Sequence, residues 1–278
     1  MGRSLKSPAV SPDRPEKRPA ASASAGTGAA SRGAGDGGPG PAPIHLRPTA
    51  PLAERVLLPG DPGRALALAQ TLLSEPRMFN HHRGLWGYTG AARDGLALTI
   101  QATGIGGPSA AIVFSELIAL GARSAIRVGT CGALAAALGL GDLVIAHHAI
   151  CADGTSRALG AGERAGADAA LTEALRRCAP GAREGTVASV DLFYESAAAD
   201  RLRGAESRTA DFASSALAVE MEASTLFTLG TIAGVSVACI LAVSDTFSPE
   251  GARRRIEDGA LLAAVERMGA AAAGALAG

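Results

Sequence analysis

From Arg55 onward, short apolar runs alternate with amphipathic stretches, and this pattern constrains the fold more than any other feature of the sequence. Several of the runs are apolar at every position, which is typical of parallel strands that are buried on both faces. Strands that alternate with helices build a sheet with helices packed on its faces. We therefore expect one α/β domain with a mostly parallel or mixed central sheet flanked by helices.

The same pattern predicts the individual elements. Asp94-Gly95 suits the positive φ angles of a tight turn, so Leu85–Ala92 and Leu96–Ala102 are expected to form a β-hairpin. Further strands are expected at 55–60, 124–128, 143–150, 184–189 and 236–243, and helices at 62–73, 107–121, 168–178, in the 196–205 region, and at 219–232 and 253–276.

Residues 1–42 differ in composition from the rest of the chain. Beyond Met1 they contain only two large apolar residues, Leu5 and Val10, among Pro, Ser, Ala and Gly. Such a segment cannot bury a core, so we expect a disordered extension at 1–42 and a folded domain at 43–278. The extension lacks an apolar run of about 7 to 15 residues, which argues against a secretory signal, and its many Pro and Gly residues argue against a transit peptide.

Charge and cysteine usage favour a cytoplasmic protein without nucleic-acid or membrane partners. The 26 Lys and Arg residues balance 26 Asp and Glu residues. The uncharged stretch 226–243 is interrupted by Gly230 and Gly234, so we expect a helix followed by a buried strand and not a membrane span. The four cysteines include no Cys-x-x-Cys pair, as expected for reduced thiols.

Two histidine pairs, His81-His82 and His147-His148, are candidate metal ligands. Adjacent residues of a strand point to opposite faces of the sheet, so the two members of a pair are not expected to share one ion. We therefore expect no metal site.

Polar residues follow several of the expected strands, where open α/β sheets bind their ligands. Gly60 and Arg64 lie between a strand and a helix N-terminus, which suits an anion; a plain turn with a surface arginine is the alternative. Arg127 interrupts an apolar strand, so it must pair either with an acid of the protein or with an external anion. Thr130 and its neighbouring glycines suit a phosphate-sized ligand. The glycine spacing after Thr103 departs from the dinucleotide fingerprint, which argues against an NAD site.

Three carboxylates lie close to these strand ends. Glu220 and Glu222 are two positions apart, and on the expected helix they point about 200° apart, so only one is expected to face inward. Acids at a helix N-terminus are also favoured by the helix dipole alone. Asp245 ends the most apolar strand, where burial is expected to raise its pKa and to keep it protonated near neutrality.

Six motifs occur in a fixed order, at Leu58–Arg64, His82–Thr89, Thr103–Ser109, Arg127–Ala133, Val219–Ala223 and Val243–Thr246. In this order they resemble the purine nucleoside phosphorylase and uridine phosphorylase family, also called the nucleoside phosphorylase-I family. The resemblance runs from about Ile44 to the C-terminus and implies that family's fold.

The resemblance implies a role for each matching residue. Phosphate would be held by Gly60, Arg64, Arg127 and Thr130, with Arg83 reaching into the site of a neighbouring subunit. The sugar would contact Met221, Glu222 and a His45 lent by the partner, and the base would contact Cys131, Gly132, Phe193, Val219 and Glu220. Asp245 would protonate the purine at N7, assisted by Arg253, Arg254 or Arg255, among which the sequence does not choose.

The implied activity is phosphate-dependent cleavage of the N-glycosidic bond of purine ribonucleosides or deoxyribonucleosides, which yields the free base and the pentose 1-phosphate. Inorganic phosphate is a co-substrate, and neither a metal nor an organic cofactor is implied. Residues lent between subunits imply a homo-oligomer based on dimers, a hexamer in this family.

Other activities stay open. Thr103–Ser109 is also similar to uridine phosphorylases, but the sequence has no Gln between Phe193 and Glu220, and those enzymes lack an acid at the position of Asp245. A methylthioadenosine phosphorylase or nucleosidase would share the fold. Hydrolysis by water, however, does not need an anion site formed by Arg64 and Arg127, which we call the arginine pair. A nucleoside-binding module would need no general acid. The sequence does not decide among adenosine, inosine, guanosine and methylthioadenosine.

Overall fold

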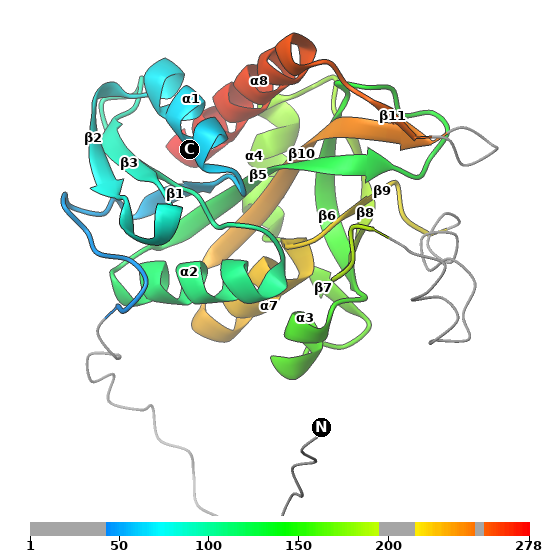
Figure 1. Ribbon diagram of the computed structural model, residues 1–278, viewed down its shortest axis with the longest axis horizontal. Helices are drawn as coiled ribbons and strands as arrows, with labels where there is room; N and C mark the ends of the chain where they lie inside the picture. The colour runs from blue at the N-terminus through cyan, green and yellow to red at the C-terminus, as the bar shows by residue number, and fades with distance from the viewer. Residues whose placement is uncertain (1–42, 195–214, 248–252) are drawn as a thin grey trace, which may run out of the picture. The chain divides into compact units, whose positions relative to one another are not determined.

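The computed structural model describes residues 43–194, 215–247 and 253–278. The extension expected to be disordered at 1–42 and the helix expected in the 196–205 region lie outside the described residues. Within them, helices cover a central mixed sheet on both faces, which confirms the expected α/β fold (Figure 1).

The strands of the described residues form one sheet in the order β11-β10-β6-β8-β9-β5-β1-β4-β3-β2, with β7 beside β6. Their bounds are β1 Arg55–Leu58, β2 Ser74–Asn80, β3 Gly87–Ala91, β4 Ala97–Gln101, β5 Ser124–Ala133, β6 Leu143–Cys151, β7 Arg164–Gly166, β8 Arg183–Ser189, β9 Ala218–Glu220, β10 Ser236–Phe247 and β11 Arg253–Arg255. Strands β4, β1, β5 and β10 are mutually parallel. Because β10 pairs with both β5 and β6, the strands β10, β6, β8, β9 and β5 close into a ring.

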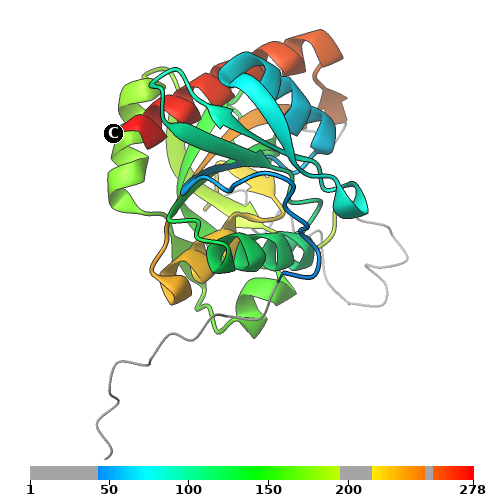
Figure 2. The ribbon, with the colours of Figure 1, turned by 90° about the vertical axis from the view of Figure 1, so that its left-hand side faces the viewer.

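Two layers of helices pack on the sheet, as Figures 1 and 2 show. One layer contains α1 (Pro62–Leu72), α4 (Ala169–Cys178) and α8 (Asp258–Ala277). The other contains α2 (Gly107–Ala119) and α7 (Ala223–Ala233), and the short helix α3 (Gly154–Ala158) contacts both α2 and α7. A 3-10 turn, η1, spans His82–Gly84. Successive strand residues face opposite layers, so Leu57 packs in one core while Val56 and Leu58 pack in the other. This two-sided burial explains why the central strands are apolar at every position.

Local sequence signals place the first strand-to-helix turn. Asp61 is the N-cap of α1, and its carboxylate accepts a hydrogen bond of 2.7 Å from the amide of Arg64. Pro62 follows as the first helical residue, where its missing N–H costs nothing. Asp61 and Pro62 therefore fix the turn after β1, and this turn positions Gly60 and the backbone of Arg64.

The expected hairpin is confirmed, since β3 pairs antiparallel with β4 and Gly95 has φ +80°. The uncharged stretch 226–243 is also confirmed as the end of α7 followed by most of β10. Two expected helix starts were wrong. The helix expected from Val219 begins only at Ala223, after strand β9, and the helix expected from Arg253 begins at Asp258, after strand β11. Strands β2, β7, β9 and β11 and helix α3 were not expected.

Helix α8 is long and apolar enough, by length and composition, to cross a membrane. In the structure it contacts α1, α4 and strands β1, β5 and β10. Met268 and Ala272 are fully buried in the core that it shares with α1. At Gly269 a Cβ atom would lie only 2.2 Å from the side chain of Leu68, so the small residue allows this close packing. The buried face of α8 is therefore accounted for by packing within the domain.

Candidate active site

The motifs meet where the parallel strands β4, β1, β5 and β10 end. The loops after β1 and β4 are joined by backbone hydrogen bonds, from Thr103 to Pro59 (2.9 Å) and from Gly104 to Gly60 (3.0 Å). A Cβ atom at Gly60 would lie 3.1 Å from the carbonyl oxygen of Gly104 and 3.9 Å from Nη2 of Arg64. Glycine therefore lets the two loops approach each other beside the Arg64 guanidinium.

Arg64 extends from the first turn of α1 with only 22% of its side chain exposed. Burial lowers the pKa of Arg64, Asp61 raises it, and the nearby charge of Arg127 lowers it further. The two guanidinium groups thus lie within electrostatic range of each other. Nη1 of Arg64 is buried and has no hydrogen-bond partner among the described residues.

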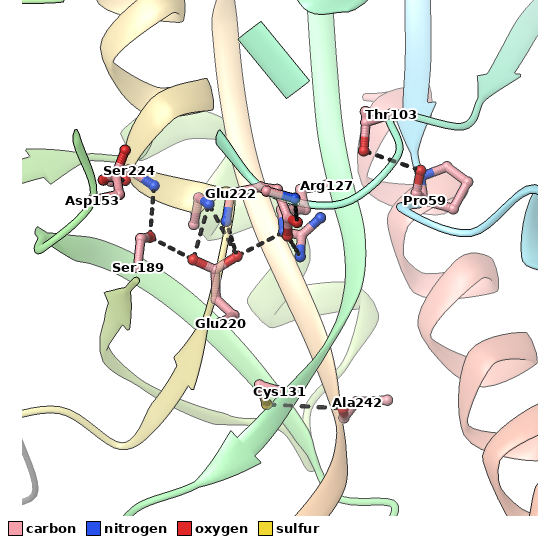
Figure 3. A network of polar contacts seen from close by, with 12 residues as sticks. Pro59, Thr103, Arg127, Cys131, Asp153, Ser189, Glu220, Glu222, Ser224 and Ala242 are labelled. Atoms are coloured by element: carbon pink, nitrogen blue, oxygen red, sulfur yellow. Dashed lines mark hydrogen bonds and ion pairs between the residues drawn. The ribbon is translucent and has the colours of Figure 1, made fainter. Parts of the chain in front are cut away.

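Arg127 lies on β5 between Leu58 of β1 and Cys239 of β10, and its side chain is 4% exposed. Its Nε donates to Oε2 of Glu220 over 2.9 Å, and its Nη2 forms an ion pair with Glu222 (Figure 3). Burial lowers the pKa of Arg127, but the two carboxylates outweigh this and raise it above the ordinary value, so the side chain stays charged. The sequence left open whether Arg127 pairs with an acid of the protein or with an external anion. The structure shows that it pairs with two acids of the protein, Glu220 and Glu222.

The expectation that only one of Glu220 and Glu222 faces inward was wrong. Glu220 ends strand β9 and Glu222 is the N-cap of α7, so the helical spacing does not apply, and both side chains are buried. The carboxylate of Glu220 accepts hydrogen bonds from the amides of Glu222 (2.9 Å) and Ala223 (3.0 Å). These bonds satisfy the amides of the N-cap residue and of the first residue of α7, and they explain why the helix begins only at Ala223.

Glu222 joins the arginine pair to the loop after β4, because its carboxylate accepts a hydrogen bond from the amide of Gly106 and pairs with Arg127. Burial raises the pKa of Glu222, Arg127 lowers it, and the charge of Glu220 raises it, with a net rise. Two carboxylates therefore share one side of the Arg127 guanidinium, whereas the ion pair of Arg64 with Asp61 spans a long 3.9 Å.

The buried, unpartnered nitrogen atoms of this site both belong to cations. Nη1 of Arg127, like Nη1 of Arg64, has no hydrogen-bond partner within the part of the chain that the structure describes. Buried donors are normally satisfied, and charged ones are costly when they are not. An anion with several acceptor oxygens, such as phosphate, fits this need. Thr130 follows on β5, half-buried, three residues beyond Arg127.

Asp245 occupies the end of β10, where a β-bulge at Ser244 shifts the register with β5. The bulge leaves both side chains buried, and the Ser244 hydroxyl lies 2.7 Å from Oδ2 of Asp245. Nε of Arg253 donates to Oδ1 over 2.8 Å, and Nη1 of Arg255 lies 3.4 Å from the same oxygen. Arg254 is paired with Thr246 in the ladder and has no such bond to Asp245 among the described contacts. Of the triplet, Arg253 therefore makes the shorter contact with Asp245 and Arg255 a longer one.

The expected rise in the pKa of Asp245 is contradicted. Burial raises the pKa of this carboxyl, but the hydrogen bonds from Arg253 and Ser244 and the charge of Arg255 outweigh burial, and the net shift is downward. The argument for a raised pKa considered burial alone. The resemblance named these arginines as candidate partners of Asp245, but β11 was not expected to pair with β10 and their charges were not weighed against burial.

The residues expected to contact a base gather near Asp245. A Cβ atom at Gly132 would lie 3.2 Å from the Phe247 ring and 3.3 Å from the Val219 side chain. Cys131 is buried, and its carbonyl accepts from the Ser244 hydroxyl over 3.3 Å. Phe193 is 52% exposed, and its ring centre lies 4.5 Å from the guanidinium carbon of Arg253. Met221, the residue expected to pack on a sugar, is half-buried between Glu220 and Glu222.

Neither His45 nor Arg83 contacts Arg64 or Arg127 among the described interactions. The imidazole of His45 lies 2.7 Å from Glu116, whose carboxylate also accepts the amides of Ile44, His45 and Leu46. Burial raises the pKa of Glu116, but these donors outweigh it and lower the pKa to about 2. Arg83 lies in η1 at φ +60°, a conformation that non-glycine residues rarely adopt.

The geometric argument about His147 and His148 was wrong. The ladder between β6 and β8 shifts register between Ala146 and His148, so the two rings do not point to opposite faces. Their Nδ1 atoms lie 2.7 Å apart, with the rings edge-on at 81°. No cluster of three or more His, Cys, Asp or Glu side chains suited to a metal occurs among the described residues.

Two residues that contact the site were not identified from the sequence, and a third, Gly106, belonged to the Thr103–Ser109 motif without an assigned role. Ser189 donates to Glu220, Gly106 donates to Glu222, and Phe247 lies over Gly132. Ser189 and Phe247 lie at the ends of strands β8 and β10, and Gly106 follows β4. Their positions at strand ends were the available signal, but a single serine, glycine or aromatic residue there does not stand out without the fold.

Comparison of the sequence with known proteins identifies the family. A sequence profile of the phosphorylase superfamily matches residues 54–277, and the chain belongs to that superfamily. The protein described as purine nucleoside phosphorylase DeoD-type from Alkaliphilus metalliredigens (strain QYMF) is 36% identical over 208 residues, which cover 72% of this chain and 85% of that protein. The protein of the same description from a strain of Bacillus cereus is 37% identical over 202 residues, covering 70% and 82%.

Proposed function

We propose that this protein catalyses the phosphate-dependent cleavage of purine nucleosides, giving the free base and a pentose 1-phosphate. The observation that carries the proposal is the pair of buried, unpartnered Nη1 atoms on Arg64 and Arg127 in the described part of a member of the phosphorylase superfamily. The descriptions of the two relatives support the same activity.

In this proposal phosphate binds between the two guanidinium groups, with the amide of Gly60 and the hydroxyl of Thr130 as further donors. Charge-assisted bonds from two directions hold the dianion and replace its water. Phosphate attacks C1′ of the nucleoside from the face opposite the base, the N-glycosidic bond breaks, and its electron pair leaves with the base. The bound dianion stabilises the positive charge that develops on the sugar.

Glu222 accepts hydrogen bonds from the ribose hydroxyls, and Met221 packs on the sugar. The N-cap position of Glu222 supports this role, since its backbone is fixed by α7 and its carboxylate already joins Arg127 to Gly106. The base lies between Phe193, Val219 and the Cys131-Gly132 backbone, with Glu220 buried behind them. Phe247 is added to this set because it lies over Gly132.

Asp245 serves as the general acid that protonates N7 of the leaving purine, so that the base departs neutral. Arg253 lowers the pKa of this carboxyl in the free enzyme, so the ion pair must loosen and the carboxylate must take up a proton from solvent before it donates that proton to the base. Inorganic phosphate is the co-substrate, and the proposed reaction uses neither a metal nor an organic cofactor.

The positions of His45 and Arg83 support an oligomer. The 43–47 segment is joined to η1 by a contact of 3.0 Å between Nδ1 of His82 and the carbonyl of His45, and among the described contacts neither His45 nor Arg83 touches Arg64 or Arg127 of its own chain. We propose that they reach the site of a neighbouring subunit in a dimer-based assembly such as a hexamer, His45 toward the 5′ end of the sugar and Arg83 toward phosphate. The cytoplasmic location also stays a prediction.

The test is to incubate the protein with inosine, adenosine, methylthioadenosine and uridine, each with and without inorganic phosphate, and to quantify base and pentose 1-phosphate. We expect phosphate-dependent release of a purine base with one equivalent of the sugar phosphate. Release without phosphate would show a hydrolytic nucleosidase, and cleavage of uridine alone would show a uridine phosphorylase. Binding of nucleoside without any cleavage would show a binding module.

A further inference from the structure

Asp153 and Ser189 are buried polar residues that the proposed reaction does not use. Asp153 lies just before α3, Ser189 ends β8, and both are completely buried. Polar side chains are costly to bury unless hydrogen bonds replace their water. Their partners therefore indicate what these two residues hold in place.

The carboxylate of Asp153 accepts hydrogen bonds from residues at the beginning of two helices, α3 and α7. It accepts hydrogen bonds from the amide (2.7 Å) and hydroxyl (2.5 Å) of Ser156 in α3. It also accepts the hydroxyls of Ser224 (2.5 Å) and Thr225 (3.2 Å) in the first turn of α7. Asp153 thus ties the beginning of α7 to α3, directly behind the N-cap residue Glu222.

Ser189 joins the same turn of α7 to the arginine pair. Its hydroxyl oxygen accepts the amide of Ser224 over 2.9 Å and donates to Oε1 of Glu220, as Figure 3 shows. The other carboxylate oxygen of Glu220 accepts Nε of Arg127. One hydroxyl therefore lies between a fixed helix amide and the carboxylate that holds Arg127.

The orientation of Arg127 depends on this carboxylate. With Nε bonded to Glu220 and Nη2 paired with Glu222, the planar guanidinium has Nη1 as its remaining corner, which no described residue accepts. A rotation of the Glu220 carboxylate would move Nε and therefore Nη1, since the guanidinium is rigid.

We propose that Ser189 is a positioning residue for phosphate, which acts through Glu220 to fix the direction of Nη1 of Arg127. Asp153 supports it through Ser224. The inference rests on the proposed function, because it concerns the binding of phosphate to the arginine pair.

The test compares Ser189→Ala with Ser156→Ala. Both serines are completely buried, and both donate a hydroxyl to a buried carboxylate of the same network. Of the two, Ser189 is the one that contacts the carboxylate holding Arg127. The Kd of inorganic phosphate is measured by calorimetry, the KM of phosphate and of nucleoside by steady-state kinetics, and the melting temperature by thermal unfolding.

We expect Ser189→Ala to raise both the Kd and the KM of phosphate about tenfold, as the loss of one charge-assisted hydrogen bond would. The KM of the nucleoside should change less than about twofold, and Ser189→Thr, which keeps the hydroxyl, should restore most of the phosphate affinity. Ser156→Ala should lower the melting temperature without changing the Kd of phosphate.

If the Kd of phosphate rises in both alanine variants in step with the loss of melting temperature, the inference is overturned and Ser189 has only a structural role. If Ser189→Ala does not fold, Ser189→Cys takes its place, since a thiol is a weak donor of similar shape. The wild-type protein separates this inference from the function. If the wild-type protein neither binds nor consumes phosphate, the proposed function is refuted. If the wild-type protein binds phosphate and Ser189→Ala binds it with the same Kd and KM, only the positioning role is refuted.

Discussion

The Nε atom of Arg253 donates a hydrogen bond to Oδ1 of Asp245 over 2.8 Å. This bond crosses from the short strand β11 to the last residues of β10, and the Arg253 guanidinium also lies over the Phe193 ring. One cation therefore contacts both the proposed general acid and the proposed stacking residue. Its bond to Asp245 gives the site a pH dependence that can be measured.

Replacing Arg253 with Met should move the pH profile of kcat/KM. Arg253 lowers the pKa of Asp245 in the free protein, so its removal raises that pKa. A general acid with a higher pKa stays protonated to higher pH, and the alkaline limb of kcat/KM should therefore shift to higher pH. Arg254→Met is the matched control, because Arg254 pairs with Thr246. A limb that moves equally in both variants would contradict the assignment of Arg253.

Replacing Asp245 with Asn should slow 6-amino nucleosides more than 6-oxo nucleosides. The amide cannot transfer a proton, and a departing 6-oxo purine can place part of its negative charge on O6, whereas adenine cannot. We expect a loss on the order of 100-fold with adenosine and a smaller loss with inosine. Single-turnover rates for both substrates measure this, and equal losses would argue against proton donation to N7.

The two arginines of the site should respond differently to truncation. The ion pair of Arg64 with Asp61 is long, so Arg64→Ala should raise the KM of phosphate with little effect on unfolding. Arg127→Ala would leave Glu220 and Glu222 buried without their cation, which typically costs about 3–5 kcal/mol of stability. Urea unfolding of both variants, together with the KM of phosphate, measures the contrast. An Arg127→Ala protein of unchanged stability would show that the buried ion pairs are not formed.

Gly129 is expected to be a sensitive position although it contacts no substrate in the proposal. A Cβ atom there would lie 2.7 Å from Cζ and from Nη2 of Arg127, and 3.0 Å from the Leu241 side chain. The guanidinium is held by two carboxylates, so Gly129→Ala must displace it, and the KM of phosphate should rise about tenfold or more. Gly162→Ala is the control, since its Cβ would meet no described atom within 4 Å. Unchanged kinetics for Gly129→Ala would mean that Arg127 can move freely.

The order of most central elements could be predicted from the sequence because their signals are local. The apolar runs at β1, β5 and β10, the Asp94-Gly95 turn and the start of α1 at Pro62 each depend on a few neighbouring residues. The predicted starts of α7 and α8 were wrong because their signals are not local. They are set by contacts between separate segments, the carboxylate of Glu220 with the first amides of α7 and the pairing of β11 with β10.

The candidate site shows the same division. The motifs identify Arg64, Arg127 and Asp245 by their position at strand ends. The sequence could not show that Glu220 and Glu222 both bind Arg127, or that Arg253 lowers the pKa of Asp245. Those relations arise from the folding of separate segments against one another, and no spacing along the chain contains them.

The place of β11 at one end of the strand order has a consequence for self-association. A strand at the edge of a sheet exposes unpaired backbone groups, on which another chain can build. All three residues of β11 are exposed arginines, and like charges brought edge to edge repel. The segment that supplies a partner for Asp245 thus also discourages growth of the sheet from this edge.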